Sequence, residues 1–174
     1  MSSIRSVLRK LAQNTGESAS LAILRGSHVL YLMREEGERS VLTVSVREKL
    51  LPANAVALGK ALLAEKPDDQ VRDIYSPDGS RRPRLPAMTT KTITSLKLLL
   101  QDLAQTRVRG YAVDYEEAIL GRGCVSVAVP LEPLGSQNLA ISVSMVVPRL
   151  AALEREMATQ LEDAKDRKIG RAHV

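Results

Sequence analysis

Two serines placed two residues apart carry the clearest chemical signal in the sequence. Ser142 and Ser144 lie in the apolar run 139–147, so a strand there would point both hydroxyls to the same face. An apolar strand with one hydroxylated face either meets solvent or lines a polar pocket. The residues alone leave that choice open.

An acidic run offers a second kind of chemistry. The segment 111–117 reads YAVDYEE and places Asp114, Glu116 and Glu117 within four residues. Paired carboxylates can serve as general acid and base. Such a run is more often an exposed loop, so the residues favour the loop without excluding acid–base work.

The single cysteine, Cys124, would need an adjacent base to act as a nucleophile. The two histidines, His28 and His173, lie in a predicted turn and near the C-terminus, and neither is placed as such a base. A small buried residue at the start of a strand is the simpler interpretation, with a pocket-lining thiol as the alternative. One cysteine also excludes an internal disulfide and fits a reducing compartment.

The start of a predicted helix near Asn54 offers an anion site. Asn54 is expected to cap a helix over 55–64, whose first turn presents N–H groups that have no intrahelical acceptor. These groups and the positive end of the helix dipole attract anions. Gly59 lies inside this helix, where it costs about 1 kcal/mol relative to Ala. Close packing against another backbone would explain its presence.

Missing motifs and the composition exclude several function classes. The sequence has no Gly-rich phosphate loop, no GxSxG, no HExxH and no paired CxxC. We therefore predict no enzymatic activity, no metal and no other cofactor. Four Tyr with no Phe or Trp argue against the aromatic stacking that binds single-stranded nucleic acid. The net charge is +5, and we interpret the charged side chains as a solvated surface instead of a nucleic-acid-binding patch.

Localisation signals are equally sparse. No apolar run approaches the roughly 20 residues that a membrane span requires, and no signal peptide is visible at the N-terminus. The sequence predicts a cytoplasmic protein without membrane contact.

The elements that must position these residues are predicted from periodicity. A helix over 3–13 carries one apolar face, which must pack on its own domain or on a neighbour. Strands are predicted over 19–24, 29–33, 41–46, 111–113, 124–130 and 139–147, and further helices over 55–64, from Pro67, from Thr94 or Ser95 to Arg109, and over 149–165. Hairpins without regular βαβ alternation predict an α/β (α+β) fold around a mostly antiparallel sheet.

Several short motifs follow one another in a recognisable order and spacing. They are 15–18 (TGES), 50–52 (LLP), 57–64 (ALGKALLA), 85–89 (LPAMT), 91–94 (KTIT), 109–114 (RGYAVD), 121–124 (GRGC) and 140–144 (AISVS). Together they resemble the effector-binding domain of the IclR family of bacterial transcription regulators, over about residues 10 to 160. The order of the motifs carries the resemblance, because each one alone is weak.

The resemblance implies a GAF-like fold, which is a curved, mostly antiparallel sheet flanked by helices, with a ligand pocket on one face. It also implies that a small organic acid effector binds at the start of the 57–64 helix, at the Asp and the Cys of the motifs, and at the two serines. Carried over, the site residues are Ala57, Leu58, Asp114, Cys124, Ser142 and Ser144.

The resemblance further implies how the chain is organised. Residues 1–14 would be a linker helix and 15–165 the effector-binding domain. Residues 166–174 lie beyond the resemblance and are expected to form a disordered tail. A winged helix-turn-helix precedes this domain in the family, so DNA binding is expected only through a domain outside this sequence. Homodimers or homotetramers are expected.

Some positions depart from the family pattern. Asn54 stands where many members have His, Tyr115 interrupts the acidic run, and Met145 and Val146 replace Gly-Pro. These bulkier residues leave the ligand identity open. Two other hypotheses remain, namely an enzyme acting on a small acid through Cys124 or Asp114, and an oligomerisation scaffold without a ligand. A solvent-exposed serine face would favour the scaffold.

Overall fold

A six-stranded sheet forms the centre of the computed structural model, which describes residues 2–40, 50–130 and 138–166. Its strand order is β3-β2-β1-β6-β5-β4, and every neighbouring pair is antiparallel. The strands are β1 (Ser18–Arg25), β2 (His28–Glu35), β3 (Leu50–Pro52), β4 (Ala112–Tyr115), β5 (Arg122–Val129) and β6 (Leu139–Val146). The predicted α/β class with an antiparallel sheet is confirmed.

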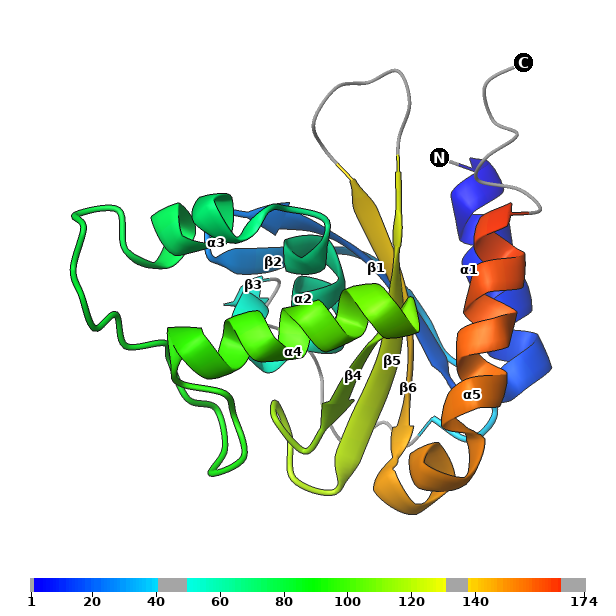
Figure 1. Ribbon diagram of the computed structural model, residues 1–174. Helices are drawn as coiled ribbons and strands as arrows, with labels where there is room; N and C mark the ends of the chain where they lie inside the picture. Colours follow the sequence, from blue (N-terminus) through cyan, green and yellow to red (C-terminus); the bar gives the residue numbers. More distant parts are fainter. Residues whose placement is uncertain (1, 41–49, 131–137, 167–174) are drawn as a thin grey trace.

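Helices cover both faces of this curled sheet (Figure 1). They are α1 (Ser2–Thr15), the short 3-10 helix η1 (Ala53–Ala55), α2 (Ala57–Ala64), α3 (Asp68–Tyr75), α4 (Leu96–Arg109) and α5 (Val147–Ala164). Helices α1 and α5 lie side by side on one face, and α2 packs on the other with α3 and α4 outside it. None of the helices in the described segments combines the length and apolar character that a bilayer crossing requires.

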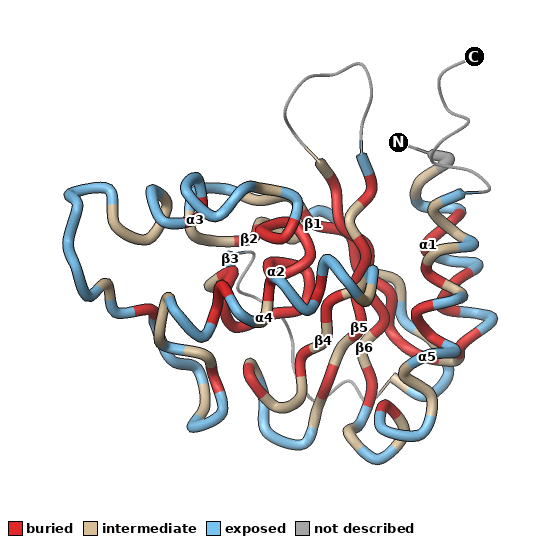
Figure 2. Tube along the Cα trace, viewed as in Figure 1, coloured by how far each residue is buried: buried red, intermediate tan, exposed pale blue. Residues whose placement is uncertain are grey.

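Alternation along the strands divides the interior into two apolar cores. On β6, Ile141 and Val143 pack against α1 and α5, whereas Ala140 packs against α2. Because successive side chains point to opposite faces, Ser142 and Ser144 share the α2 side with Ala140. Buried residues follow these central strands and α2 (Figure 2).

The apolar face of α1 is used within its own domain. Val7, Leu8 and Leu11 are buried in the core beneath α5, and Ile4 packs against that core. Of the two alternatives for this helix, the structure shows packing on its own sheet. The stripe is therefore not a free contact surface for a second copy.

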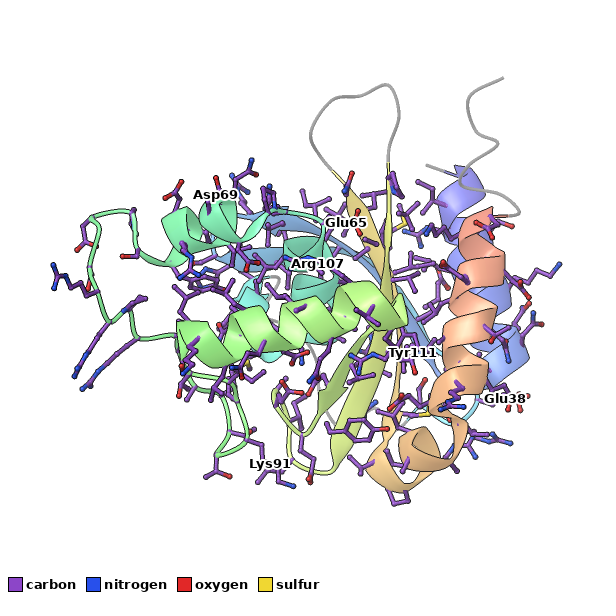
Figure 3. All side chains as sticks on the ribbon, in the orientation of Figure 1. Glu38, Glu65, Asp69, Lys91, Arg107 and Tyr111 are labelled. Atoms are coloured by element: carbon purple, nitrogen blue, oxygen red, sulfur yellow. The ribbon has the colours of Figure 1, made fainter. Side chains whose placement is uncertain are left out.

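The outer helices are tied to α2 by one arginine. Arg107 of α4 donates hydrogen bonds to the carbonyl of Ala64 at 2.8 Å and to that of Lys66 at 2.9 Å, and it pairs with Asp68 at 3.2 Å (Figure 3). The orphan carbonyls that end a helix are thereby satisfied, and α2, α3 and α4 are held as one layer.

The predicted cap at Asn54 is wrong. Residues 53–55 form η1, and the extended residue Val56 precedes α2, which starts at Ala57 without a side-chain cap. Asn54 is buried, and its amide donates to the carbonyls of Pro86 at 3.0 Å and Ile93 at 2.8 Å. The side chain is used to hold the 85–94 segment instead of the helix end.

Other local predictions are confirmed. Ser95 caps α4 by accepting a hydrogen bond from the Leu98 N–H, and Gly110 ends it with φ at +90°. A Cβ on Gly59 would overlap the Ala53 backbone, so the expected close backbone contact is present. The predicted strand 41–46 lies outside the described residues, and β3 was not predicted.

Candidate ligand-binding site

A small cavity lies between the sheet and the segment that leads into α2. Its volume is about 60 Å³, and one water needs about 10–15 Å³, so it accommodates roughly four to six water-sized groups. Asp114, Cys124, Ser142 and Ser144 line it, which brings together four of the six predicted site residues. The hydroxylated face of β6 therefore meets a pocket.

Strand register explains why these four residues converge. Cys124 of β5 lies directly opposite Asp114 of β4 on one side and opposite Ser144 of β6 on the other. Ser144 in turn lies opposite Ser18 of β1. Directly opposed residues of antiparallel strands have Cα atoms about 4.5–5.5 Å apart. Four neighbouring strands, β4, β5, β6 and β1, thus place their polar side chains in one row.

Ala57 and Leu58 are not among the residues that line the cavity. Both are buried in the apolar core around α2, and Val56, directly before them, contributes to the cavity wall instead. The first turn of α2 follows Val56, and its N–H groups have no intrahelical acceptors. The backbone start of this helix is close to the cavity, whereas the two side chains point into the core.

Asp114 lies in an unusual electrostatic environment. It is only 3% exposed, and its Oδ1 accepts a hydrogen bond from the Glu117 N–H at 2.7 Å. Burial, followed by the nearby Glu117 carboxylate, raises the pKa of Asp114 to about 7. Its carboxyl therefore exchanges between the neutral and charged forms near neutral pH, and can both donate and accept hydrogen bonds.

A stability measurement can check this raised pKa. Between about pH 4 and pH 7 the folded protein keeps a proton on Asp114 that the unfolded chain has lost, so the stability should fall as pH rises, by up to about 1.4 kcal/mol per pH unit. Asp114→Asn should flatten urea-unfolding stabilities over that window. Asp73→Asn, at an exposed carboxylate, is the control and should leave the slope unchanged. A slope in Asp114→Asn that parallels the wild type would contradict the assignment.

Behind Asp114 lies a buried charge cluster that sequence reasoning missed. Lys60 of α2 is 1% exposed, and its Nζ donates to Asp102 Oδ2 of α4 at 2.8 Å and to Glu117 Oε1 at 2.9 Å. Glu117 then connects to the cavity through its N–H bond to Asp114. The available signal was the lone charge in the otherwise apolar segment 57–64, since a buried ammonium must find acidic partners.

The thiol in the cavity is not activated. Burial and, secondarily, the Asp114 carboxylate raise the pKa of Cys124 to about 12, so the thiol stays protonated at neutral pH. A protonated thiol is a poor nucleophile. This removes the basis for an enzyme that uses Cys124.

Four further polar residues line the cavity without having been predicted. They are Ser20, Tyr31, Arg34 and Arg122. The serine could have been found, because Ser18 and Ser20 repeat the spacing of Ser142 and Ser144. Arg122 also had a signal, since it precedes Cys124 by two residues on the same strand.

A β-bulge in β2 explains why Tyr31 and Arg34 both line the cavity. Along β2, Tyr31 pairs with Ala22 and Arg34 pairs with Ser20, and Leu32 has no partner on β1. The extra residue shifts the alternation by one position, so side chains three residues apart reach the same face. Strict alternation along the sequence would have placed Tyr31 and Arg34 on opposite faces.

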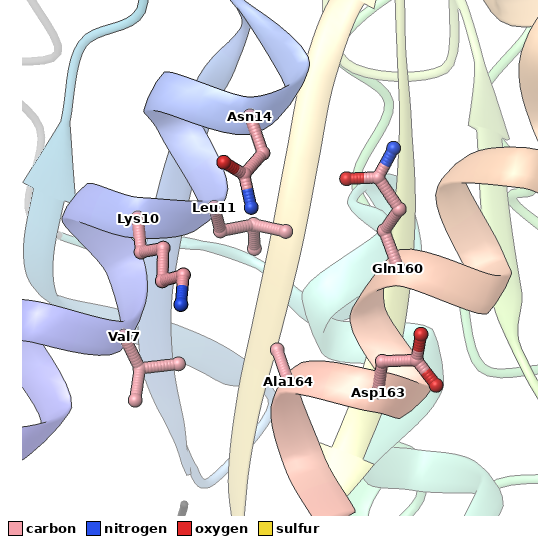
Figure 4. Close-up of a pocket in the computed structure, with 7 residues that line it drawn as sticks. All are labelled: Val7, Lys10, Leu11, Asn14, Gln160, Asp163 and Ala164. Atoms are coloured by element: carbon pink, nitrogen blue, oxygen red, sulfur yellow. The ribbon is translucent and has the colours of Figure 1, made fainter. Parts of the chain in front are cut away.

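A groove on the other side of the sheet lies between α1 and α5 (Figure 4). Lys10 and Asn14 of α1 face Gln160 and Asp163 of α5 across it, and its volume is about 130 Å³. These four polar residues are exposed or half-buried, whereas Ser20, Asp114 and Ser142 of the smaller cavity are buried. The smaller cavity is therefore the better ligand site.

Known proteins resemble this chain over almost its whole described length. Residues 1–169 match the family model described as the bacterial transcriptional regulator IclR C-terminal domain. The chain is 36% identical over 172 residues to the HTH-type transcriptional regulator BhcR of Paracoccus denitrificans, covering 97% of this chain and 59% of BhcR. It is 31% identical over 159 residues to the HTH-type transcriptional repressor AllR of Escherichia coli strain K12, covering 91% of this chain and 56% of AllR. The chain thus spans a little over half the length of these relatives.

Solved structures show the same fold. The Thermotoga maritima IclR structure superposes with a TM-score of 0.83 at 27% identity, covering 95% of this chain and 65% of that one. The C-terminal domain of the E. coli transcriptional regulator KdgR gives a TM-score of 0.75 at 30% identity, covering 95% and 94%. These relatives are transcriptional regulators and not enzymes, in agreement with the sequence-based prediction. The chain therefore belongs to the IclR family of bacterial transcriptional regulators and has the fold of the family's effector-binding C-terminal domain.

Proposed function

We propose that this chain senses a small organic acid, which binds in the cavity lined by Asp114, Cys124, Ser142 and Ser144. The observation that carries the proposal is the group of polar side chains on the wall of this one small cavity, of which Ser20, Asp114 and Ser142 are buried. Buried polar groups require hydrogen-bond partners, and a ligand with acid and hydroxyl or carbonyl oxygens supplies them.

Charge favours an acid over a neutral ligand. Two guanidinium groups, those of Arg34 and Arg122, line the cavity, and the one carboxyl there, Asp114, is partly protonated at neutral pH. Only Arg34 has an acidic partner within the described segments, at Glu36. The cavity therefore carries a net positive charge, which attracts an anion.

In the proposed complex, Ser142 donates a hydrogen bond to the ligand carboxylate, and Ser144 donates to another oxygen of the ligand. Val56 lines the cavity, and the backbone N–H groups of Ala57 and Leu58 follow it at the positive end of α2. These N–H groups stabilise the negative charge of the ligand carboxylate. Asp114 accepts from a ligand hydroxyl when ionised and donates to a ligand oxygen when protonated. The Cys124 thiol packs beside the ligand.

Ligand binding would then bias the arrangement of a larger regulator. We propose that the domain assembles into homodimers or homotetramers in the cytoplasm, and that an effector changes the relative placement of the DNA-binding domains attached to it. Both named relatives are HTH-type regulators and extend beyond the matched region. Sedimentation equilibrium at micromolar concentration separates these assemblies from a monomer of 19.0 kDa.

A binding experiment tests the site. A thermal-shift screen of carboxylic, hydroxy and oxo acids with two to four carbons should identify a stabilising ligand, because a ligand that binds only the folded state stabilises by RT ln(1 + [L]/Kd). Ser142→Ala should weaken the calorimetric affinity for that acid by roughly 1–3 kcal/mol through a lost hydrogen bond.

Ser126→Ala is the matched control. Ser126 lies directly opposite Ser142 on the same face, does not line the cavity, and donates to the Ile141 carbonyl at 2.9 Å. Its loss should lower stability and leave the affinity unchanged. Unchanged affinity in Ser142→Ala and Asp114→Asn alike would show that the cavity is not the binding site.

A further inference from the structure

We propose that Arg122 binds a second acid group of the ligand, so that the cavity prefers a short dicarboxylate to a monocarboxylate of the same length. The inference rests on the proposed function, since it concerns the ligand class of the same cavity. It is carried by the position and the bonding of two arginines on the cavity wall.

Most N–H donors of the Arg122 guanidinium have no acceptor among the described residues. It begins β5 two residues before Cys124, so both side chains point to the cavity face. Of the five N–H donors of a guanidinium, one has an acceptor among the described residues, from Nη2 to Ser144 Oγ at a long 3.3 Å. Within residues 2–40, 50–130 and 138–166, no carboxylate forms an ion pair with it.

Arg34 differs because its charge is already compensated. Its Nε donates to Glu36 Oε1 at 2.5 Å, and its Nη2 donates to Ser18 Oγ at 3.2 Å. Glu36 also accepts from the Ser18 hydroxyl through Oε2 at 2.8 Å. These bonds fix the Arg34 side chain and neutralise it, so that Arg122 supplies the remaining positive charge.

The two arginines converge on one end of the cavity. Arg122 donates to Ser144 and Arg34 donates to Ser18, and these two serines lie directly opposite each other on β6 and β1. An anionic group at this end would accept from Arg122 in the bidentate geometry that guanidinium and carboxylate share.

This end is separate from the place proposed for the first acid group. Ser142 lies two residues before Ser144 on β6, which is about 7 Å along a strand. The guanidinium of Arg122 reaches Ser144, so an acid group at Ser142 and another at Arg122 are one such step apart. Short dicarboxylates bridge that distance once a hydrogen bond is added at each end.

Calorimetry with matched acids tests the assignment. Malonate is compared with propionate, and succinate with butyrate, because each pair has the same number of carbons. The wild type should bind the dicarboxylate of a pair at least about ten-fold more tightly, which corresponds to about 1.4 kcal/mol. Arg122→Gln should remove most of that preference while changing the monocarboxylate affinity by less than about three-fold.

Two further variants keep the result interpretable. Arg122→Lys keeps the charge without the bidentate fork and should retain part of the preference. Arg25→Gln, at an exposed arginine of β1 outside the cavity, should change neither affinity. Arg122→Lys and the wild-type comparison still decide the matter if Arg122→Gln does not fold.

The outcomes separate this inference from the proposed function. Equal wild-type affinities for both acids of each pair, with no effect of Arg122→Gln, overturn the second acid site and leave an acid-binding cavity in place. An equal loss of both affinities in Arg122→Gln assigns Arg122 to the first acid group and also overturns the inference. If no acid binds the wild type, the proposed function itself fails and the inference fails with it.

Discussion

Replacing Lys60 with methionine should destabilise the domain by about 3–5 kcal/mol, as expected when one partner of a buried ion pair is removed. Methionine has a similar length and keeps the apolar contacts of the side chain. It removes the ammonium that serves Asp102 and Glu117, whose side chains are only 19% and 11% exposed. Two carboxylates are then left in the interior without a counter-charge.

Urea unfolding at neutral pH measures this loss. Lys165→Met is the matched control, because Lys165 pairs with Glu162 at 3.3 Å where both side chains are substantially exposed. That pair should contribute no more than about 0.5 kcal/mol. Combining Lys60→Met with Asp102→Asn and Glu117→Gln should recover part of the loss, because no uncompensated charge remains. A single variant as stable as the wild type would contradict the structural role of the cluster.

Gly59→Ala is expected to destabilise the domain, against the trend of helix propensity. In an exposed helix interior the same change would stabilise by about 1 kcal/mol. Here the new Cβ would overlap the Ala53 backbone, which cannot move aside as a flexible side chain could. Overpacking of this kind typically costs about 1–3 kcal/mol, and more where the backbone must shift. The sign of the change therefore distinguishes tertiary packing from local preference.

Gly79→Ala provides the comparison. Gly79 has φ at +74° and no neighbouring atom within 4 Å of a Cβ, so only the left-handed backbone penalty of roughly 1–2 kcal/mol applies. Gly59→Ala should lose more stability in chemical denaturation than Gly79→Ala. It should also reduce acid binding, because η1, Val56 and the first turn of α2 would move together. A stabilised Gly59→Ala variant would show that the contact with Ala53 is loose.

Features that depend only on neighbouring residues were predictable from the amino-acid sequence. The alternation along 139–147 predicts that Ser142 and Ser144 share a face, because the side-chain direction in a strand repeats every two residues. The cap at Ser95 and the left-handed stop at Gly110 are also local, since each depends on bonds within one helical turn. The antiparallel α/β class follows from the order of such elements.

Asn54 is a residue whose tertiary contacts outweigh its local preference. Its residue type suits a helix cap, but its amide bonds the carbonyls of Pro86 and Ile93, 32 and 39 residues away. Two long-range hydrogen bonds and the 3-10 turn over 53–55 outweigh one local cap. A preference for capping is worth about 1 kcal/mol, which tertiary contacts can readily exceed.

The roles of the polar residues depend on contacts between elements that are distant in the chain. The choice between solvent and pocket for the serine face was made by α2 packing on that side of the sheet. The bulge at Leu32 brought Tyr31 and Arg34 to the cavity, and no periodic pattern contains such an inserted residue. Lys60 finds partners 42 and 57 positions away. Burial sets the charge of Asp114 in the same way, because desolvation depends on every element packed around a carboxyl and not on its neighbours in sequence.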